Sequence, residues 1–214
     1  MNKNHINKII RALIVSDFFL FFSIGLLSPI FAVFILQNID NKIEVIGYAV
    51  SLYWLVRVIT VIPLSRLMDK MKSEMDEYYF MIIGTFITAC VPLFYIVSQA
   101  PWHIYLLQII SGLANSMAVP AWRILFTNHI DSRIIGFEWS LEDVGIGVAT
   151  ASSATLGAFI ADKFGFNILF VIIFFFGLIG TAVLLSLGQN KRSVIKELFR
   201  NRGDKVPLKI DGIK

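Results

Sequence analysis

VIGYAVSLYWLVRVITVIPLSRLM, residues 45–68, decides the fold class. The stretch is 24 residues long, and its charged residues are Arg57 at the centre and Arg66 near the end. A helix needs about 20 mainly apolar residues to cross a hydrocarbon core about 30 Å thick. We therefore expect this stretch to form a transmembrane helix.

The whole chain has the same character as this stretch. It has 214 residues, of which 57% are hydrophobic and 16% charged, and its mean hydropathy is +0.74. Soluble domains are nearer ~45–50% apolar and ~25% charged. The apolar excess must face lipid or a large partner, which excludes a soluble enzyme.

Six stretches are long enough to span a bilayer as helices. They are Leu13–Leu36, Val45–Met68, Tyr78–Ser98, Trp102–Phe126, Phe137–Ala161 and Ile168–Leu187. Short polar or turn-forming segments separate them, so neighbouring helices run antiparallel. The fold class that we predict is an all-α, polytopic membrane protein with six transmembrane helices.

Lys and Arg sort by membrane side. One side, which includes both chain ends, carries 16 of the 19 basic residues; the opposite side carries only Lys42 and Lys163, and Arg57 lies within a span. The positive-inside rule places both termini in the cytoplasm of a cell-membrane protein, and the first span is too long for a signal peptide. Because the basic residues follow the membrane sides rather than one patch, we predict no nucleic-acid partner.

Two domains are expected: a transmembrane domain over residues 1–189 and a basic cytoplasmic tail over residues 190–214. Within the tail, Lys191–Arg202 places Val194, Ile195, Leu198 and Phe199 on one helical face. This pattern is typical of a helix lying on an anionic membrane surface, and a solvated basic tail is the alternative.

The chain contains a weak internal repeat. Pro29 lies eleven residues before Asp40, as Pro120 lies eleven residues before Asp131, and the sequences around the two aspartates are alike. The repeat units are about 12–98 and 102–189, each of three helices, so the second starts on the other side of the membrane. Such 3+3 inverted repeats are typical of secondary transporters, although chance similarity is the alternative.

The pattern of residues 10–188 resembles the N-terminal half of the major facilitator superfamily (MFS). Asp69 and Lys70 match the family's cytoplasmic loop after the second helix, whereas Ser65 replaces its first glycine. Gln108 stands where the fourth helix of proton-coupled members carries arginine, and Ser153-Ala154 replace the Gly-Pro of antiporters. The resemblance implies a transporter, with the conformational role of that loop falling on Asp69 and Lys70.

Family members usually have twelve helices in two halves, and this chain supplies six. Two parallel copies would recreate the full arrangement, so we predict a homodimer that moves a small solute by alternating access. A truncated gene and a half that pairs with a different six-helix chain are the alternatives to a homodimer. A non-transporting membrane assembly or accessory protein, or degenerate half-transporter, is the alternative function.

Six polar or aromatic residues are candidates for the substrate site. Arg57 lies in mid-membrane, where an unpaired cation costs at least ~2.5–3.5 kcal/mol, and Asp17 is about 9 Å shallower. The two could form a cavity-lining pair or a fixed structural ion pair. The candidate substrate-binding residues are Asp17, Tyr53, Trp54, Arg57, Gln108 and Asn115.

A second set of charged residues gathers toward the cytoplasmic side. The fifth span opens with three carboxylates, which suit a helix N-terminus and lie at a depth similar to Arg123. An inner gate of salt bridges and simple helix capping are both compatible with this position. The candidate gating residues are Asp69, Lys70, Arg123, Glu138, Glu142 and Asp143.

No catalytic or metal-binding pattern is present in the sequence. An intramembrane enzyme would need a nucleophile and base or a motif such as H-E-x-x-H, and neither occurs. We therefore predict no enzymatic activity, no cofactor and no metal. The expected partners are the lipid bilayer, a second six-helix half and a small solute whose identity the cavity residues leave open.

Overall fold

A computed structural model of the chain describes residues 6–70 and 73–189. The predicted cytoplasmic tail, with its candidate amphipathic helix, lies outside these residues. In the described part every regular element is a helix. This confirms the predicted all-α class.

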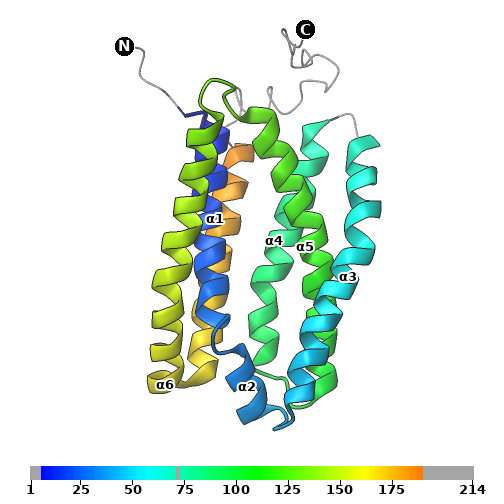
Figure 1. The fold of residues 1–214 in the computed structure, drawn as a ribbon, viewed down its shortest axis with the longest axis vertical. Helices are drawn as coiled ribbons and strands as arrows, with labels where there is room; N and C mark the ends of the chain where they lie inside the picture. The colour runs from blue at the N-terminus through cyan, green and yellow to red at the C-terminus, as the bar shows by residue number, and fades with distance from the viewer. Residues whose placement is uncertain (1–5, 71–72, 190–214) are drawn as a thin grey trace, which may run out of the picture.

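The bundle is built from long helices that run side by side (Figure 1). They are α1 (Lys8–Leu27), α2 (Phe31–Asn38), α3 (Ile43–Lys70), α4 (Glu74–Tyr95), α5 (Pro101–His129) and α6 (Ile135–Gln189). The start of α1 and the end of α6 lie at the same end of the bundle, which Figure 1 draws at the top. We call this end the basic end, because Lys8, Lys70 and Arg133 lie there.

Among the described residues, five helices are long and apolar enough to cross a membrane. The fifth of them, α6, runs along the bundle twice (Figure 1). α6 reverses direction at Gly165, where φ is +83° and ψ is 167° (Figure 1). A side chain at that φ would clash with the backbone, so glycine is suited to this turn. The six predicted spans therefore correspond to six passes along the bundle.

The first predicted span differs from the structure in one respect. Residues 13–36 were expected to form one helix, but the chain breaks at Ser28–Ile30 between α1 and α2. Pro29 explains the break, since proline donates no hydrogen bond and its ring clashes with the preceding turn. By contrast, α5 continues through Pro120, so the two prolines of the predicted repeat have different effects.

The helices pack against one another in distinct pairs. α1 packs against both arms of α6, α4 lies between α5 and the second arm of α6, and α3 packs against α5. Glycines permit the closest approaches: a Cβ on Gly157 of α6 would overlap the backbone of Leu26, and one on Gly84 of α4 would lie 2.5 Å from the Ala114 carbonyl oxygen. Small residues at such crossings let membrane helices approach closely.

Two apolar clusters hold the bundle, one toward each end. The cluster at the basic end includes Ile10, Met81 and Phe126, and the other includes Leu26, Phe34 and Phe170. The polar residues Asp17, Thr88 and Asn115 fall between these clusters along their helices. The middle of the bundle is therefore its polar layer.

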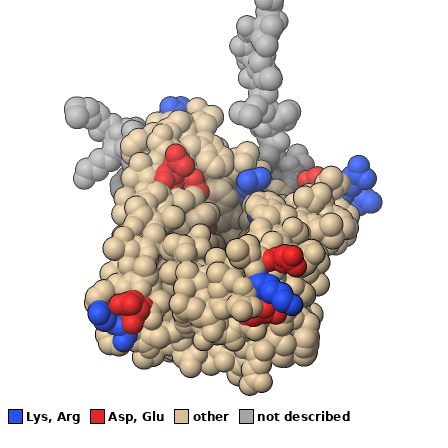
Figure 2. All heavy atoms as spheres, turned by 60° about the horizontal axis from the view of Figure 1, so that its bottom comes forward, with Lys and Arg blue, Asp and Glu red and all other residues tan. Residues whose placement is uncertain are grey.

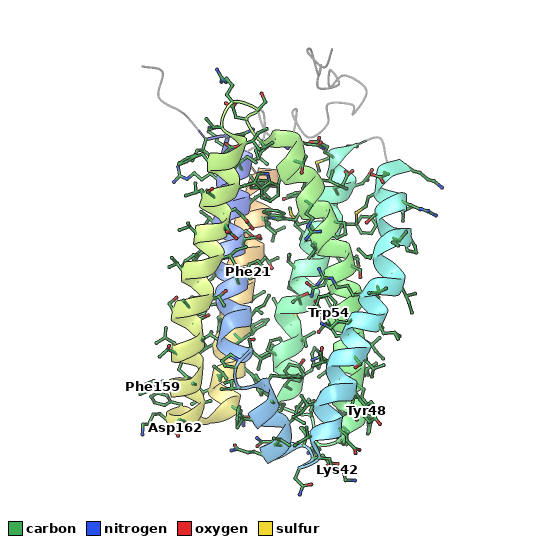
Figure 3. All side chains as sticks on the ribbon, in the orientation of Figure 1. Phe21, Lys42, Tyr48, Trp54, Phe159 and Asp162 are labelled. Atoms are coloured by element: carbon green, nitrogen blue, oxygen red, sulfur yellow. The ribbon has the colours of Figure 1, made fainter. Side chains whose placement is uncertain are left out.

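Most of the surface that Figure 2 shows is uncharged. Figure 2 shows Lys, Arg, Asp and Glu gathered toward the two ends, with a hollow between the helices in this view. Lys42 and Asp162 lie at the end opposite the basic end (Figure 3). An uncharged belt between charged ends is typical of a protein embedded in a bilayer.

The loops at the two predicted repeat positions are built alike. The Asp40 carboxylate accepts the backbone N–H of Lys42 at 3.1 Å, and the Asp131 carboxylate accepts that of Arg133 at 2.9 Å. Each of these turns leads into the helix that follows, α3 or α6. This likeness is local, and the 3+3 inverted repeat stays a prediction.

Candidate functional site

The first cavity, of about 370 Å³, lies in the half of the bundle away from the basic end. Two amide side chains from α5, Gln108 and Asn115, line it together with Tyr53 of α3 and Tyr95 of α4. The Gln108 amide nitrogen lies 3.4 Å from the Tyr95 hydroxyl, and the Asn115 amide donates to the Ser111 carbonyl at 3.1 Å. We call this space the amide cavity, and it contains three of the six predicted substrate-binding residues.

Arg57 is held by aromatic side chains of its own helix. It donates to the Tyr53 hydroxyl at 3.1 Å, and its guanidinium carbon lies 5.1 Å from the centre of the Trp54 ring. Cation–π contacts of this kind favour a cation over an aromatic face. Trp54 itself is 53% exposed, and Figure 3 shows it near the middle of α3.

The sequence offered Asp17 as the partner of Arg57, either in a cavity-lining pair or in a fixed structural ion pair. In residues 6–70 and 73–189 the two side chains form no ion pair. Arg57 lies on α3, which packs mainly against α5, whereas Asp17 lies on α1, which packs mainly against α6. Tyr53 and Trp54 take the place that a carboxylate was expected to fill. Periodicity fixes depth in the membrane, but it does not fix which helices face each other.

A second cavity, of about 320 Å³, contains the charged candidates. Asp17 from α1, Arg123 from α5 and Glu142 from the first arm of α6 line it. Asn115 of α5 lines it as well, so the structure brings two predicted substrate-binding residues together with two predicted gating residues. We call this space the carboxylate cavity.

The two cavities adjoin. Leu20, Ile24, Thr88 and Asn115 line both of them. The two cavities therefore meet between α1, α4 and α5. Asn115 is the predicted site residue that both cavities share.

The other predicted gating residues lie outside the cavities. Glu138 is fully buried, and its carboxylate accepts the backbone N–H of Asp131 at 2.9 Å, which fastens the loop before α6. Asp143 is exposed on α6, and Asp69 and Lys70 are exposed at the end of α3. Glu138 thus has the geometry of a loop anchor.

The Asp131 loop lies outside the membrane-spanning segments, and it carries an exposed ion pair. Arg133 donates to Asp131 through its side chain at 3.1 Å and through its backbone N–H at 2.9 Å. Hydrogen bonds from the Arg133 side chain and then from its backbone lower the pKa of Asp131. Because the pair is open to water, its effect on stability is small.

Sequence reasoning missed two aromatic residues of the carboxylate cavity. Trp122 and Trp139 both line it, and their ring centres are 6.2 Å apart. Trp122 adjoins Arg123, and Trp139 adjoins Glu138, so their proximity to the predicted charges was a usable signal. Two helices distant in sequence had to be brought together before this aromatic wall was visible.

A buried polar contact between helix ends was also missed. Glu74 at the start of α4 accepts a hydrogen bond from Asn128 at 2.9 Å and lies 3.4 Å from the His129 ring nitrogen. It joins α4 to the end of α5 near the basic end. Among residues 6–70 and 73–189, no group of three His, Cys, Asp or Glu side chains is arranged to hold a metal ion.

Long apolar helices around a polar central layer with adjoining cavities define a class of protein, a transporter-like membrane bundle. The sequence profile of the Major Facilitator Superfamily matches residues 13–210. The chain belongs to this family of integral membrane transporters, which confirms the resemblance found in the sequence.

Individual proteins are also similar to this chain, over part of their own length. The chain is 24% identical to the multidrug resistance protein MdtG of Salmonella schwarzengrund (strain CVM19633) and 23% identical to MdtG of Serratia proteamaculans (strain 568). Each match covers 77% of this chain. The chain spans only 41% and 40% of those proteins. Its fold is similar to that of the POT family transporter PepTSo, with a TM-score of 0.72, 12% identity and coverage of 94% of this chain and 39% of that one.

Proposed function

We propose that the chain is one half of a secondary active transporter that works by alternating access, and that a second, parallel copy supplies the other half. The observation that carries this proposal is that most of α3 is not covered by the other helices. Only 11% of the residues in its most apolar window are buried, against 39–44% for the other membrane-crossing helices of the described chain. One side of α3 nevertheless contributes Tyr53 to the amide cavity, so the cavity borders the uncovered face.

Lipid alone is a poor cover for this face. Val58 and Ile59 are more than 60% exposed and suit acyl chains, but Arg57 lies beside them in mid-helix. A cation at that depth needs hydration, an anion or an aromatic surface. A second protein half with a water-accessible cavity supplies such surroundings, whereas a pure lipid contact does not.

The opposite edge of the bundle offers a complementary charge. α3 and the first arm of α6 lie at the two edges of the bundle in Figure 1, and Asp143 is exposed on α6. A two-fold axis along the membrane normal places α3 of each copy against α6 of the other, so any contact between Arg57 and Asp143 occurs twice. Opposite charges on facing edges favour this register over others.

The depths of the two residues permit the contact. Arg57 lies 13 residues before Lys70, and Asp143 lies eight residues after Ile135, both counted from the basic end. At 1.5 Å per residue the two lie about 20 Å and about 12 Å from that end, about 8 Å apart in depth. An extended arginine that bends toward the basic end spans most of this difference.

In this proposal the basic end faces the cytoplasm of the cell membrane. Lys8, Lys70 and Arg133 at that end follow the positive-inside rule, with Lys42 and Lys163 opposite. The two halves rock about the interface and expose the amide and carboxylate cavities to one side at a time. A small solute moves between the sides as the cavities change their exposure.

A labelling experiment tests alternating access without knowledge of the solute. In a background with Cys90→Ala, Asn115→Cys is placed where the two cavities meet, and Ile179→Cys serves as a control on an exposed side of α6. A membrane-impermeant maleimide should label Asn115→Cys in proteoliposomes from either side, with no leak of small ions. Labelling from one side alone, or a permanent ion leak, contradicts alternating access.

Charge exchange tests the partner. Arg57→Asp and Asp143→Arg should each reduce the dimer fraction and the two-sided labelling, and the double variant should recover both, because the pair re-forms in reverse. Asp162→Arg, at the opposite end of the bundle, is the matched control and should change neither. A dimer that forms normally but is never labelled from both sides favours the accessory-protein alternative.

A further inference from the structure

The first turn of α5 is capped by a histidine. Ala100 occupies the N-cap position, and its methyl side chain cannot accept a hydrogen bond from the backbone of that turn. The acceptor is instead Nδ1 of His103, to which the backbone N–H groups of Ala100 and Gln99 donate at 3.2 Å and 3.3 Å. In a capping box, Glu or Gln at this third position of the helix accepts the same bond. His103 therefore holds the turn between α4 and α5.

Only the neutral ring of His103 can accept these bonds. A ring nitrogen that accepts has a free lone pair, so the proton of the neutral ring lies on Nε2. Protonation adds a hydrogen to Nδ1, which then faces two donors. It also places a positive charge at the N-terminus of α5, where the helix dipole disfavours a cation. The cap is therefore present while the ring is neutral and lost when the ring is protonated.

Trp102 gives the protonated ring another contact. The indole lies over the imidazole of His103, with ring centres 3.8 Å apart and an interplanar angle of 33°. An indole face attracts a cation, so an imidazolium keeps this contact while it loses its bonds to the turn. His103 is half-buried and Trp102 is exposed, so protons reach the ring from water. The charge of one ring thus selects between two partners.

The charged groups near the start of α5 do not bind His103. The titratable groups that the neighbouring elements place toward this end of the bundle are Asp40, Lys42, Glu44, Tyr48, Tyr95, Asp162 and Lys163. Within residues 6–70 and 73–189, none of them forms an ion pair with His103. Asp162 pairs with Lys163, and Lys42 and Glu44 are exposed to water, where salt weakens their fields. The protonation of His103 therefore follows the pH of the solution on its own side of the membrane.

We propose that His103 is a pH-sensitive cap, and that its protonation from the side opposite the basic end releases the α4–α5 turn. A histidine ordinarily changes charge between about pH 5 and pH 8. The turn joins the two helices at the end that Figure 1 draws at the bottom, which faces away from the cytoplasm in the proposed orientation.

Release of the turn affects the amide cavity. Tyr95 is the last residue of α4, and its hydroxyl lies 3.4 Å from the amide nitrogen of Gln108 on α5. Both residues line the amide cavity, so the turn holds one of its walls together. Acid on this side therefore widens access to the cavity. This step rests on the proposed function, whereas the pH-sensitive cap does not.

Hydrogen exchange at the α4–α5 turn tests the cap. The full chain in lipid nanodiscs is compared at pH 8 and pH 5 with His103→Gln, which caps without titrating, and with His103→Ala, which has no acceptor. After correction for intrinsic exchange rates, the amides of Gln99 and Ala100 in the unaltered chain should lose about fivefold in protection at pH 5, as expected for a lost cap. His103→Gln should stay protected at both pH values, and His103→Ala at neither.

Two results would overturn this cap. One is equal protection of the unaltered chain at pH 8 and pH 5, and the other is a loss at pH 5 that persists in His103→Gln. The start of α1 is the matched control, because the Asn7 amide oxygen accepts the backbone N–H of Ile9 at 3.0 Å and does not titrate. Protection of Ile9 should be the same at both pH values. An equal loss there means that the whole bundle responds to acid, which also overturns a local cap.

The tautomer of His103 gives a test that does not depend on the stability of a variant. In spectra of the ¹⁵N-histidine-labelled chain, the signals of His103 are those that His103→Gln lacks. At pH 8 the ring should carry its proton on Nε2, and at pH 5 both nitrogens should be protonated. A neutral ring with its proton on Nδ1 contradicts the cap.

Maleimide labelling tests the effect on access. Asn115→Cys in the Cys90→Ala background is labelled from the side opposite the basic end, with His103 and with His103→Gln. The ratio of the two rates cancels the pH dependence of the thiol. It should be near one at pH 8 and about fivefold higher at pH 5, because the turn opens only with His103. A ratio near one at both pH values overturns the effect on access.

The outcome is separable from that of the proposed function. A cap that is lost at pH 5 in a chain that fails the two-sided labelling test refutes alternating access and leaves the pH-sensitive cap in place. Two-sided labelling by a chain whose turn is equally protected at pH 8 and pH 5 refutes the pH-sensitive cap and leaves the transporter.

Discussion

α1 and α3 are both apolar membrane helices of nearly equal mean hydropathy, yet they have different surroundings. In their most apolar windows 44% of the α1 residues are buried and only 11% of the α3 residues. α1 lies between the two arms of α6, whereas α3 contacts α5 along one side. Composition therefore identifies a helix that crosses a membrane, but packing shows which helix still lacks a neighbour.

The largest effect is expected where α1 is enclosed. Gly157→Val puts a branched side chain onto the Leu26 backbone, 2.8 Å from its Cα, and neither helix can move away because the second arm of α6 also packs on α1. We expect a loss of about 3 kcal/mol or more, or failure to fold, in thermal unfolding of the detergent-solubilised chain.

Gly147→Val is the matched control on the same arm of α6. A Cβ at Gly147 meets no other atom within 4 Å, so this variant should keep the melting temperature of the unaltered chain within a few degrees. Equal losses for the two valine variants would contradict the close packing of α1.

A smaller effect is expected at the equivalent contact of α3. Gly112→Ala puts a Cβ 2.6 Å from the Tyr53 carbonyl oxygen, but α3 is covered on one side only and can shift outward. We expect a loss of about 1–2 kcal/mol by the same unfolding measurement.

Gly47→Ala in α3, with open space around the new Cβ, should be neutral or slightly stabilising. If Gly112→Ala is as damaging as Gly157→Val, α3 is held as firmly as α1 and the contrast between them fails.

One hydrogen bond joins α3 to α5 and contributes to the stability of their contact. The Thr60 hydroxyl donates to the Ser116 hydroxyl of α5 at 2.8 Å, and Ser116 is fully buried. Ser116→Ala should lower the free energy of unfolding by about 0.6–1.7 kcal/mol. Ser152→Ala is the control, because the exposed Ser152 hydroxyl bonds only to carbonyls of its own helix, and it should leave the free energy of unfolding unchanged. If Ser152→Ala lowers the free energy of unfolding as much as Ser116→Ala does, the α3–α5 hydrogen bond does not stabilise α3.

The smallest effect is expected in the Asp131 loop, outside the bundle. Because hydrogen bonds from Arg133 lower the pKa of Asp131, their contribution is present above the carboxyl's unfolded pKa of about 3.9 and is lost as the pH falls through the lower folded pKa. Arg133→Gln should therefore differ slightly from the unaltered chain at pH 6 and match it near pH 2.

Lys42→Gln in the similar Asp40 loop is the control, because Lys42 contacts Asp40 through its backbone N–H. Its melting temperature should follow that of the unaltered chain at both pH values. An Arg133→Gln difference that grows on acidification contradicts the sign of the pKa change.

The sequence predicted the membrane helices well because apolar length is a local property. The expected span Val45–Met68 lies within α3, and the expected turn between the fifth and sixth spans contains Gly165. The break at Pro29 was missed because hydropathy continues across it, although the proline itself was visible. Gln108 and Asn115 line the same cavity, since seven residues are close to two helical turns; their role in substrate binding stays a prediction.

The composition of the site was harder to predict. Asp17 was singled out from its depth, but its neighbours Glu142, Trp122 and Trp139 come from helices more than 100 residues later. Arg57 was expected beside Asp17, and it contacts Tyr53 and Trp54 instead. One helix's pattern specifies which side chains share a face, whereas the contacts across a cavity depend on how all the helices pack.

The central claim is that the bare face of α3 belongs against a second six-helix half of the same kind. Native mass spectrometry of the chain released from lipid nanodiscs tests it most directly. The account predicts a complex of twice the 24.2 kDa chain mass, reduced to single chains by Arg57→Asp and restored by the added Asp143→Arg. A single chain of 24.2 kDa that is labelled from both sides of the membrane at Asn115→Cys would contradict it.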